Sequence, residues 1–238
     1  MFTRASLIAV LGLVGALFAC GGDGKSVNTT NPTSSVPASA TSNSVTTTDT
    51  TMSTAQLDSM LLDVGDVGGG WQLGPEVADA DFSDSTQLPC NDMALNPTII
   101  ERLTPVTGIQ FEPTDRSYKH IVEFLVTGEP QRLALDLQFY FEGMEACAAT
   151  TPTTIDAGTL TVEPFTIPML GDQRAAYVLT GVESPDATWY VRSAEVRVGS
   201  IATEVALTEI LSTPENEPTV TDAEFVQLLE TAVAKLSG

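Results

Sequence analysis

The sequence predicts an α+β fold, an antiparallel sheet of about five to seven strands with two main helices packed on it. Three observations predict it. The spacing of apolar residues predicts elements in the order helix, strands, helix, several strands, helix, and does not show a regular alternation of strand and helix. Two segments, 133–147 and 222–236, are strongly amphipathic helices. Residues 55–238 are long enough to form a single well-buried core.

The folded part begins with a helix and a glycine stop. Apolar residues three and four apart predict a helix over 56–62, and Gly68–Gly70 end this region before Trp71 opens a strand. The glycines could also cradle a phosphate, but no Lys-Ser or Lys-Thr pair follows them and no helix begins there. We therefore expect a turn.

An acidic loop and two strands come next. Residues 79–89 read as a loop, 97–102 as a short helix, and 106–111 and 117–127 as strands. In the second strand both alternating sets of residues include apolar side chains, so we expect both of its faces to be at least partly covered.

The two main helices carry start signals. Glu129 and Pro130 suit the first turn of the central helix. Thr221 and Glu224 have the spacing of a capping box at the start of the closing helix. The segments between the helices that we expect to be strands are 159–165, 174–182, 188–198 and 200–210, with a tight hairpin at Gly199.

Residues 1–19 have the order of a bacterial lipoprotein signal peptide. One positive charge precedes an uncharged apolar run over 5–18, which is too short for a comfortable membrane span. The run ends in Leu17-Phe18-Ala19-Cys20, which resembles a lipobox. That resemblance implies cleavage before Cys20 and a diacylglycerol with a further acyl chain such as palmitate on it. An ordinary signal peptide with a chance cysteine, or a short anchor helix, is the alternative.

A tether is expected to separate the lipid from the folded domain. Ser and Thr make up 17 of the 29 residues 26–54, so this segment cannot bury enough apolar surface to order itself. We expect residues 20–54 to be a lipidated, disordered spacer, and residues 55–238 to be one globular domain at the extracytoplasmic face of the cell membrane. O-glycosylation of the spacer is a hypothesis.

Charge and cysteines limit the partners. With 31 acidic and 10 basic residues, the net charge of −21 excludes nucleic acid as the main partner. Once Cys20 is lipidated, Cys90 and Cys147 remain, and export to an oxidising compartment favours a disulfide between them. Two free thiols or a metal pair are the alternatives, although a metal would want further ligands.

No pattern indicates catalysis, a metal or a cofactor. His120 is the one histidine, on an alternating strand, and we expect it to be a core or edge residue. Three carboxylates lie close together in the sequence, at Asp79, Asp81 and Asp84, which could suggest a calcium site. The central glycine and the final glutamate of a calcium-binding loop are missing, however. Asp172 is expected to be a turn residue. We therefore expect no enzyme.

The folded part is similar to the extracytoplasmic sensor-domain family first described on a mycobacterial serine/threonine kinase, protein kinase H. The resemblance is carried by the opening helix, by cysteines at 90 and 147, by Leu170-Gly171-Asp172-Gln173, by a hairpin after Val196-Arg197-Val198 and by the closing helix. It implies an actinobacterial lipoprotein with an antiparallel sheet, flanking helices and a cleft that binds an unidentified ligand. The kinase sensor has two cysteine pairs and an attached kinase domain, whereas this chain has one cysteine pair and no attached kinase. A second lipoprotein family, with a Mog1/PsbP-like sheet and closing helix, has almost the same element order.

The leading functional hypothesis is a membrane-anchored, non-catalytic binding or sensor-like module. Its groove would lie between the sheet and the central helix. The aromatic residues expected to line it are Trp71, Tyr140, Phe141, Tyr177, Trp189 and Tyr190. Each of them could instead be plain core packing. The partner would be an unknown small ligand or an envelope protein, and a lipid or glycolipid carrier or a protein-interaction adaptor are the other functions considered.

Overall fold

The computed structural model describes residues 52–75, 107–115, 117–155, 158–184, 187–212 and 217–237. It confirms the α+β class, with one antiparallel sheet of strand order β1-β2-β3-β8-β7-β6-β5-β4. Eight strands are counted because two three-residue segments extend its edges. The elements of the described chain, in order, are α2 (Thr54–Asp58), β1 (Trp71–Leu73), β2 (Thr107–Pro113), β3 (Lys119–Thr127), α5 (Pro130–Ala148), β4 (Thr153–Ile155), β5 (Gly158–Pro164), β6 (Gln173–Ser184), β7 (Ala187–Val198), β8 (Ile201–Leu211) and α6 (Asp222–Leu236).

The predicted helix starts are confirmed. The Glu129 carboxylate accepts hydrogen bonds from the first free N–H groups of α5, with Pro130 as the first helical residue. Thr221 and Glu224 form a reciprocal capping box at the start of α6. The helix predicted over 56–62 runs instead from Thr54 to Asp58. Beyond it, the Met60 and Leu61 N–H groups donate to carbonyls three residues back, and the Leu62 N–H donates to the Glu123 carboxyl group at 2.6 Å.

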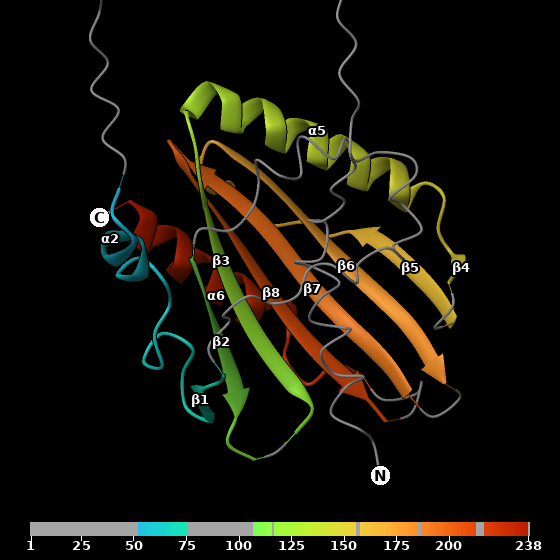
Figure 1. The fold of residues 1–238 in the computed structure, drawn as a ribbon. Helices are drawn as coiled ribbons and strands as arrows, with labels where there is room; N and C mark the ends of the chain where they lie inside the picture. Colours follow the sequence, from blue (N-terminus) through green and yellow to red (C-terminus); the bar gives the residue numbers. More distant parts are fainter. Residues whose placement is uncertain are drawn as a thin grey trace, which may run out of the picture.

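The two main helices lie on opposite faces of the sheet (Figure 1). Successive residues of a strand point to opposite faces, and β8 shows this clearly. Its odd-numbered residues, such as Val205 and Leu207, pack with α6, whereas the even-numbered Ala202 packs with α5. Residues 201–209 of β8 are all buried, so both faces of the central sheet are covered. We call the two sides the α5 face and the α6 face.

The α6 face holds the largest core. The α6 side chains Phe225, Leu228, Leu229, Ala232 and Val233 pack against β-strand residues there. Helix α2 adds Leu57 to the same face, beside Leu236. On the other face, α5 contributes Leu133 and Leu137 at one end and Cys147 at the other.

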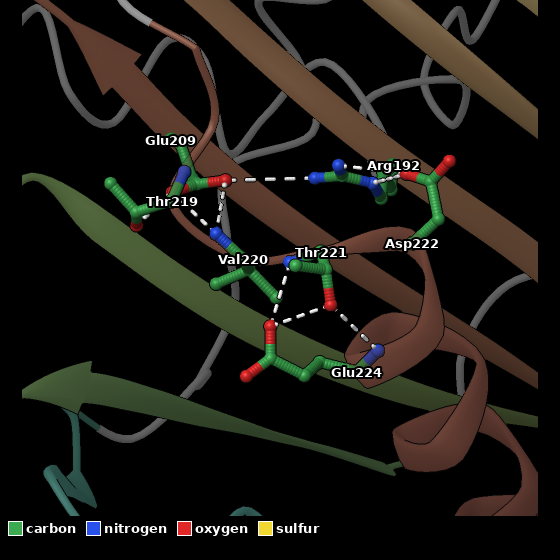
Figure 2. Close-up of polar contacts among 7 residues, drawn as sticks. All are labelled: Arg192, Glu209, Thr219, Val220, Thr221, Asp222 and Glu224. Atoms are coloured by element: carbon green, nitrogen blue, oxygen red, sulfur yellow. Dashed lines mark hydrogen bonds and ion pairs between the residues drawn. The ribbon is translucent and has the colours of Figure 1, made fainter.

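A buried ion-pair network fixes the start of α6 on the sheet (Figure 2). Arg192 of β7 is 4% exposed and Glu209 of β8 is 1% exposed. The Arg192 guanidinium lies 3.5 Å from Glu209 and 2.9 Å from Asp222, the first residue of α6. Glu209 also accepts hydrogen bonds from the Thr219 amide and hydroxyl, at 2.9 and 2.6 Å. The network therefore ties β7, β8 and the segment before α6 together.

Replacing Arg192 with Met should lower the free energy of unfolding by about 3–5 kcal/mol, because it leaves the Glu209 carboxylate buried without its cation. The Asp222 side chain is 65% exposed, so Asp222→Asn, the matched control, should cost under about 1 kcal/mol. Urea unfolding followed by circular dichroism measures both. Similar losses for the two variants would contradict a network centred on the buried pair.

Glu123 of β3 is a second buried acid on the α6 face. Its carboxyl group accepts from the Leu62 N–H and from the Thr203 hydroxyl at 3.0 Å. Burial raises the pKa of Glu123 from 4.5 to about 7, although both hydrogen bonds and nearby Lys235 oppose the shift. Because the folded state holds this proton more tightly than the unfolded state, the contribution of Glu123 to stability falls as the pH rises from about 4.5 to about 7.

Glu123→Gln keeps the shape of the protonated side chain and cannot ionise. The variant should match the wild type at pH 4 and exceed its unfolding free energy by up to about 3 kcal/mol at pH 8. Urea titrations across this pH range test it, with the exposed Glu230→Gln as a control that leaves the pH profile unchanged. A variant that is less stable than the wild type at pH 8 would show that Glu123 is ionised in the fold.

Candidate functional site

An open cavity of about 440 Å³ lies where the chain leaves the edge of β6. Strand β5 ends at Pro164, and after the Phe165 N–H donates to the Ala176 carbonyl at 2.8 Å the segment no longer pairs with β6. Pro164 and Pro168 flank this segment, and proline has no N–H for a strand ladder. The cavity is lined by Phe141 of α5, by Phe165, Thr166 and Ile167, and by Gln173, Arg174, Ala175 and Ala176 of β6.

The cavity lining combines apolar and polar groups. Phe141, Phe165 and Ile167 provide apolar walls. The Arg174 guanidinium donates to the Met169 sulfur, and none of the described acidic side chains forms an ion pair with it. Such an arrangement can bind a small molecule, because ligand pockets are mostly apolar with a few well-placed polar groups.

Gln173 joins the cavity to α5. Its side-chain amide donates to the Ala134 carbonyl of α5 at 3.0 Å and accepts from Arg197 Nε at 2.7 Å. One amide therefore links the helix, β6 and β7. It holds α5 beside the strand edge that forms one wall of the cavity.

The Leu170–Gln173 segment also fastens the β7–β8 hairpin. Asp172 accepts from the Gly199 N–H at 2.8 Å and lies 3.3 Å from Arg197 Nη1. The Asp172 N–H donates to the Arg197 carbonyl at 2.7 Å. Asp172 is thus a turn residue, as predicted, and the segment sets the position of the cavity residues that follow it.

Gly171 and Gly199 offer a matched test of this fastening. Both have positive φ, +59° and +61°. A Cβ at Gly171 would lie 2.3 Å from the Arg197 carbonyl oxygen, whereas nothing lies within 4 Å of one at Gly199. Gly199→Ala should therefore cost only the backbone penalty of about 1–2 kcal/mol, and Gly171→Ala clearly more. Chemical denaturation measures both, and equal losses would contradict the close contact.

A pair of acids, Glu204 buried and Glu195 partly buried, lies on the α5 face next to the cavity. Glu195 of β7 and Glu204 of β8 are direct cross-strand neighbours, and Ala175 of the cavity wall is opposite Glu195 on its other side. The Ser193 hydroxyl donates to Glu204 Oε1 at 3.1 Å, while Glu195 Oε2 is buried without a hydrogen-bond partner. Burial, and for Glu195 also the neighbouring carboxyl group, raises the pKa of both acids. At neutral pH the pair therefore holds at least one proton.

Four of the six predicted groove residues share the α5 face. Tyr177 and Trp189 are buried in one cluster of this face, and the Tyr177 hydroxyl donates to the Phe141 carbonyl at 3.2 Å. Tyr140 and Phe141 pack at the other end of α5, with their rings in edge contact. Burial raises the pKa of Tyr140 far above its usual value, and Glu195 and Glu204 add to the shift. Of the six residues, Phe141 lines the cavity.

The other two predicted groove residues lie on the α6 face. Trp71 packs at the margin of the α6 core. Tyr190 lies under Arg192, whose guanidinium carbon is 4.7 Å from the ring centroid. These two side chains are therefore separated from the α5-face residues by the sheet.

His120 occupies the α5 face of β3 and is 8% exposed. Neither ring nitrogen has a hydrogen-bond partner, and burial lowers its pKa, so it is neutral at pH 7. No described nucleophile is hydrogen-bonded to it. The expectation of a core residue is confirmed.

The remaining predicted positions fall largely outside the described residues. These are Cys20, Cys90, the tether to residue 51, the acidic loop 79–89 and the short helix 97–102. Cys147 is buried at the end of α5 and is not a free thiol. Because Cys90 is outside the described residues, the pairing of these two cysteines stays a prediction. Within the described ranges no three His, Cys, Asp or Glu side chains gather as a metal site, and no described helix is long and apolar enough to cross a membrane.

Most of the cavity residues are not identifiable from the sequence. The strands predicted over 159–165 and 174–182 include Phe165 and Arg174, and no prediction concerns Ile167. The available signal was the pair of prolines four residues apart, which predicts that the segment between them leaves the sheet. Nothing in the sequence indicates that Phe141 of the distant helix α5 lines the same cavity.

Comparison with known proteins supports the fold. The chain is similar to the extracellular domain of PknH from Mycobacterium tuberculosis, with a TM-score of 0.51 and 12% sequence identity over 78% of this chain and 97% of that domain. This likeness supports the expected fold, which resembles that of the PknH extracellular domain. No known family model and no curated protein sequence matches the chain.

Proposed function

We propose that this chain is a membrane-anchored extracytoplasmic lipoprotein whose globular domain is a non-catalytic, sensor-like module that binds a small ligand. The lipobox-like sequence at Cys20 supports the anchor, and the Ser/Thr-rich segment after it supports a spacer between membrane and domain. The fold, shared with the extracellular domain of a kinase, supports a position outside the cytoplasm.

The cavity at the β6 edge is the observation that carries the ligand-binding proposal. Its volume of about 440 Å³ lies within the range of roughly 300–1,000 Å³ that is usual for small-molecule sites. It is open to solvent. Phe141 of α5 and residues 173–176 of β6 form part of its wall, and Gln173 links these two elements. Residues 165–167, which follow β5, form the rest of the wall. An open site suits reversible binding. A carrier of long acyl chains would instead need a larger enclosed cavity.

Native mass spectrometry of the full chain, extracted from its own membrane in mild detergent, tests the proposal. We expect a population heavier than the lipidated protein by the mass of one bound molecule. Thr166→Trp places a large ring at the exposed mouth of the cavity and should remove this population. Leu135→Trp, on the exposed surface of α5, is the control and should retain it.

The outcomes separate the candidate functions. Loss of the bound mass in Thr166→Trp alone supports ligand binding in this cavity. A bound mass unchanged by that variant would place the ligand elsewhere. A bound molecule that fragments as a diacyl lipid would favour the carrier function, and no bound mass in any preparation would contradict a ligand-binding module.

The same spectra test the anchor and the cysteines. We propose that Cys20 carries diacylglycerol and that Cys90 is joined to Cys147. Cys20→Ser should remove the lipid mass and release the chain from the membrane fraction. Peptides containing Cys90 and Cys147 should be linked before reduction and separate after it. Free, alkylated Cys90 in the untreated protein would contradict the pairing.

A further inference from the structure

We propose that the cavity at the β6 edge takes an amphipathic anion, an apolar group that carries a single carboxylate or phosphate, and that Arg174 binds the anionic group. This inference rests on the proposed function, because it names the ligand class of the same cavity. It depends on three features of the cavity: an arginine without an ion-pair partner among the described residues, the unpaired edge of β6, and apolar side chains in the walls.

The Arg174 guanidinium forms no ion pair with any acid of the described residues, although the protein is rich in carboxylates. The chain has 31 acidic side chains against 10 basic ones. The other arginines of the described residues are each paired with an acid, Arg132 with Asp136, Arg192 with Glu209 and Asp222, and Arg197 with Asp172. Arg174 is partly buried and lines the cavity, and within the described part of the chain its guanidinium donates only to the sulfur of Met169. A thioether is a weak acceptor, so an arriving anion would displace it easily.

The backbone of Arg174 adds a second donor at the same place. In an antiparallel ladder the N–H and C=O of alternate residues point to the same side of the strand. The Ala176 carbonyl accepts from Phe165, so the N–H of Arg174, two residues earlier, faces the same side, toward the cavity. None of the described residues hydrogen-bonds to this N–H. A carboxylate or phosphate has enough acceptor oxygens to use both the guanidinium and the amide.

The apolar walls define the other half of the ligand. Phe141 approaches from α5, and Phe165 and Ile167 from the segment that leaves the sheet. The acids Glu195 and Glu204 lie on the far side of Ala175 and retain at least one proton at neutral pH, which limits their repulsion of an anion. A purely polar anion would leave these walls solvated, whereas an attached alkyl or aromatic group would bury them.

Binding of octanoate to the full chain in phosphatidylcholine nanodiscs tests the inference. Isothermal titration calorimetry, with empty nanodiscs as the blank, compares octanoate, octyl phosphate, neutral octanol and inorganic phosphate. We expect the two amphipathic anions to bind, octanol to bind at least tenfold more weakly, and inorganic phosphate not to bind. Arg174→Gln should weaken octanoate binding at least tenfold and leave octanol unchanged. The control Arg132→Gln, on the exposed side of α5, should leave both unchanged, with thermal unfolding checked for each variant.

Each outcome distinguishes one part of the proposal from the others. Equal octanoate affinity in the wild type and in Arg174→Gln overturns the role of Arg174. Equal affinity of the wild type for octanol and octanoate overturns the proposal that the ligand is an anion. Neither result contradicts the proposed function of the domain as a ligand-binding module. Binding of inorganic phosphate as tightly as octyl phosphate would identify a free-anion site and overturn the amphiphile. If no probe binds while native mass spectrometry shows a retained molecule, the ligand class is wrong and the proposed function holds.

Discussion

Strand β8 is buried on both of its faces, and this burial determines where the rest of the molecule is placed. An antiparallel sheet usually leaves one face to water. Here residues 201–209 are all buried, and α5 and α6 cover opposite sides. Two independent cores follow, and neither helix can be moved without exposing apolar side chains of β8. The edges of the sheet, β1 with β2 on one side and β4 with β5 on the other, are free to vary, and the cavity lies where one of these edges comes apart.

Two-sided burial also brings acids into the interior of a strongly acidic protein. The central strands carry three buried acids, Glu123, Glu204 and Glu209. The polar partners of their carboxyl groups differ. Glu209 has a buried arginine, Glu123 has two hydrogen-bond donors, and Glu204 has a serine hydroxyl and an acidic neighbour. A buried acid without a cation raises its pKa and holds a proton. Among the described arginines, Arg174 alone forms no ion pair with a described acid.

The sequence predicts the main helices and the long strands in their order, although not the short strand β4, because the signals of these elements are local. Gly199, the capping box of Thr221 and Glu224, and Glu129 and Pro130 at the start of α5 all act within a few residues. Local signals do not determine which aromatic residues lie together in one groove. Trp189 and Tyr190 are adjacent on a strand and so must point to opposite faces, a constraint that the strand assignment already contained. The presence of Phe141 and the Phe165–Ile167 segment around one cavity depends on how α5 packs on the sheet, which no local pattern encodes.

The ligand-binding function requires that the open edge of β6 is a ligand site and not a packing defect. A crystal structure of the protein purified from its own membrane, with no ligand added, tests this most directly. We expect electron density for a small molecule in the cavity lined by Phe141, Phe165 and Ile167, with its charged end at Arg174. A cavity closed by the protein's own side chains, or Arg174 paired with an acid of its own chain, would contradict it.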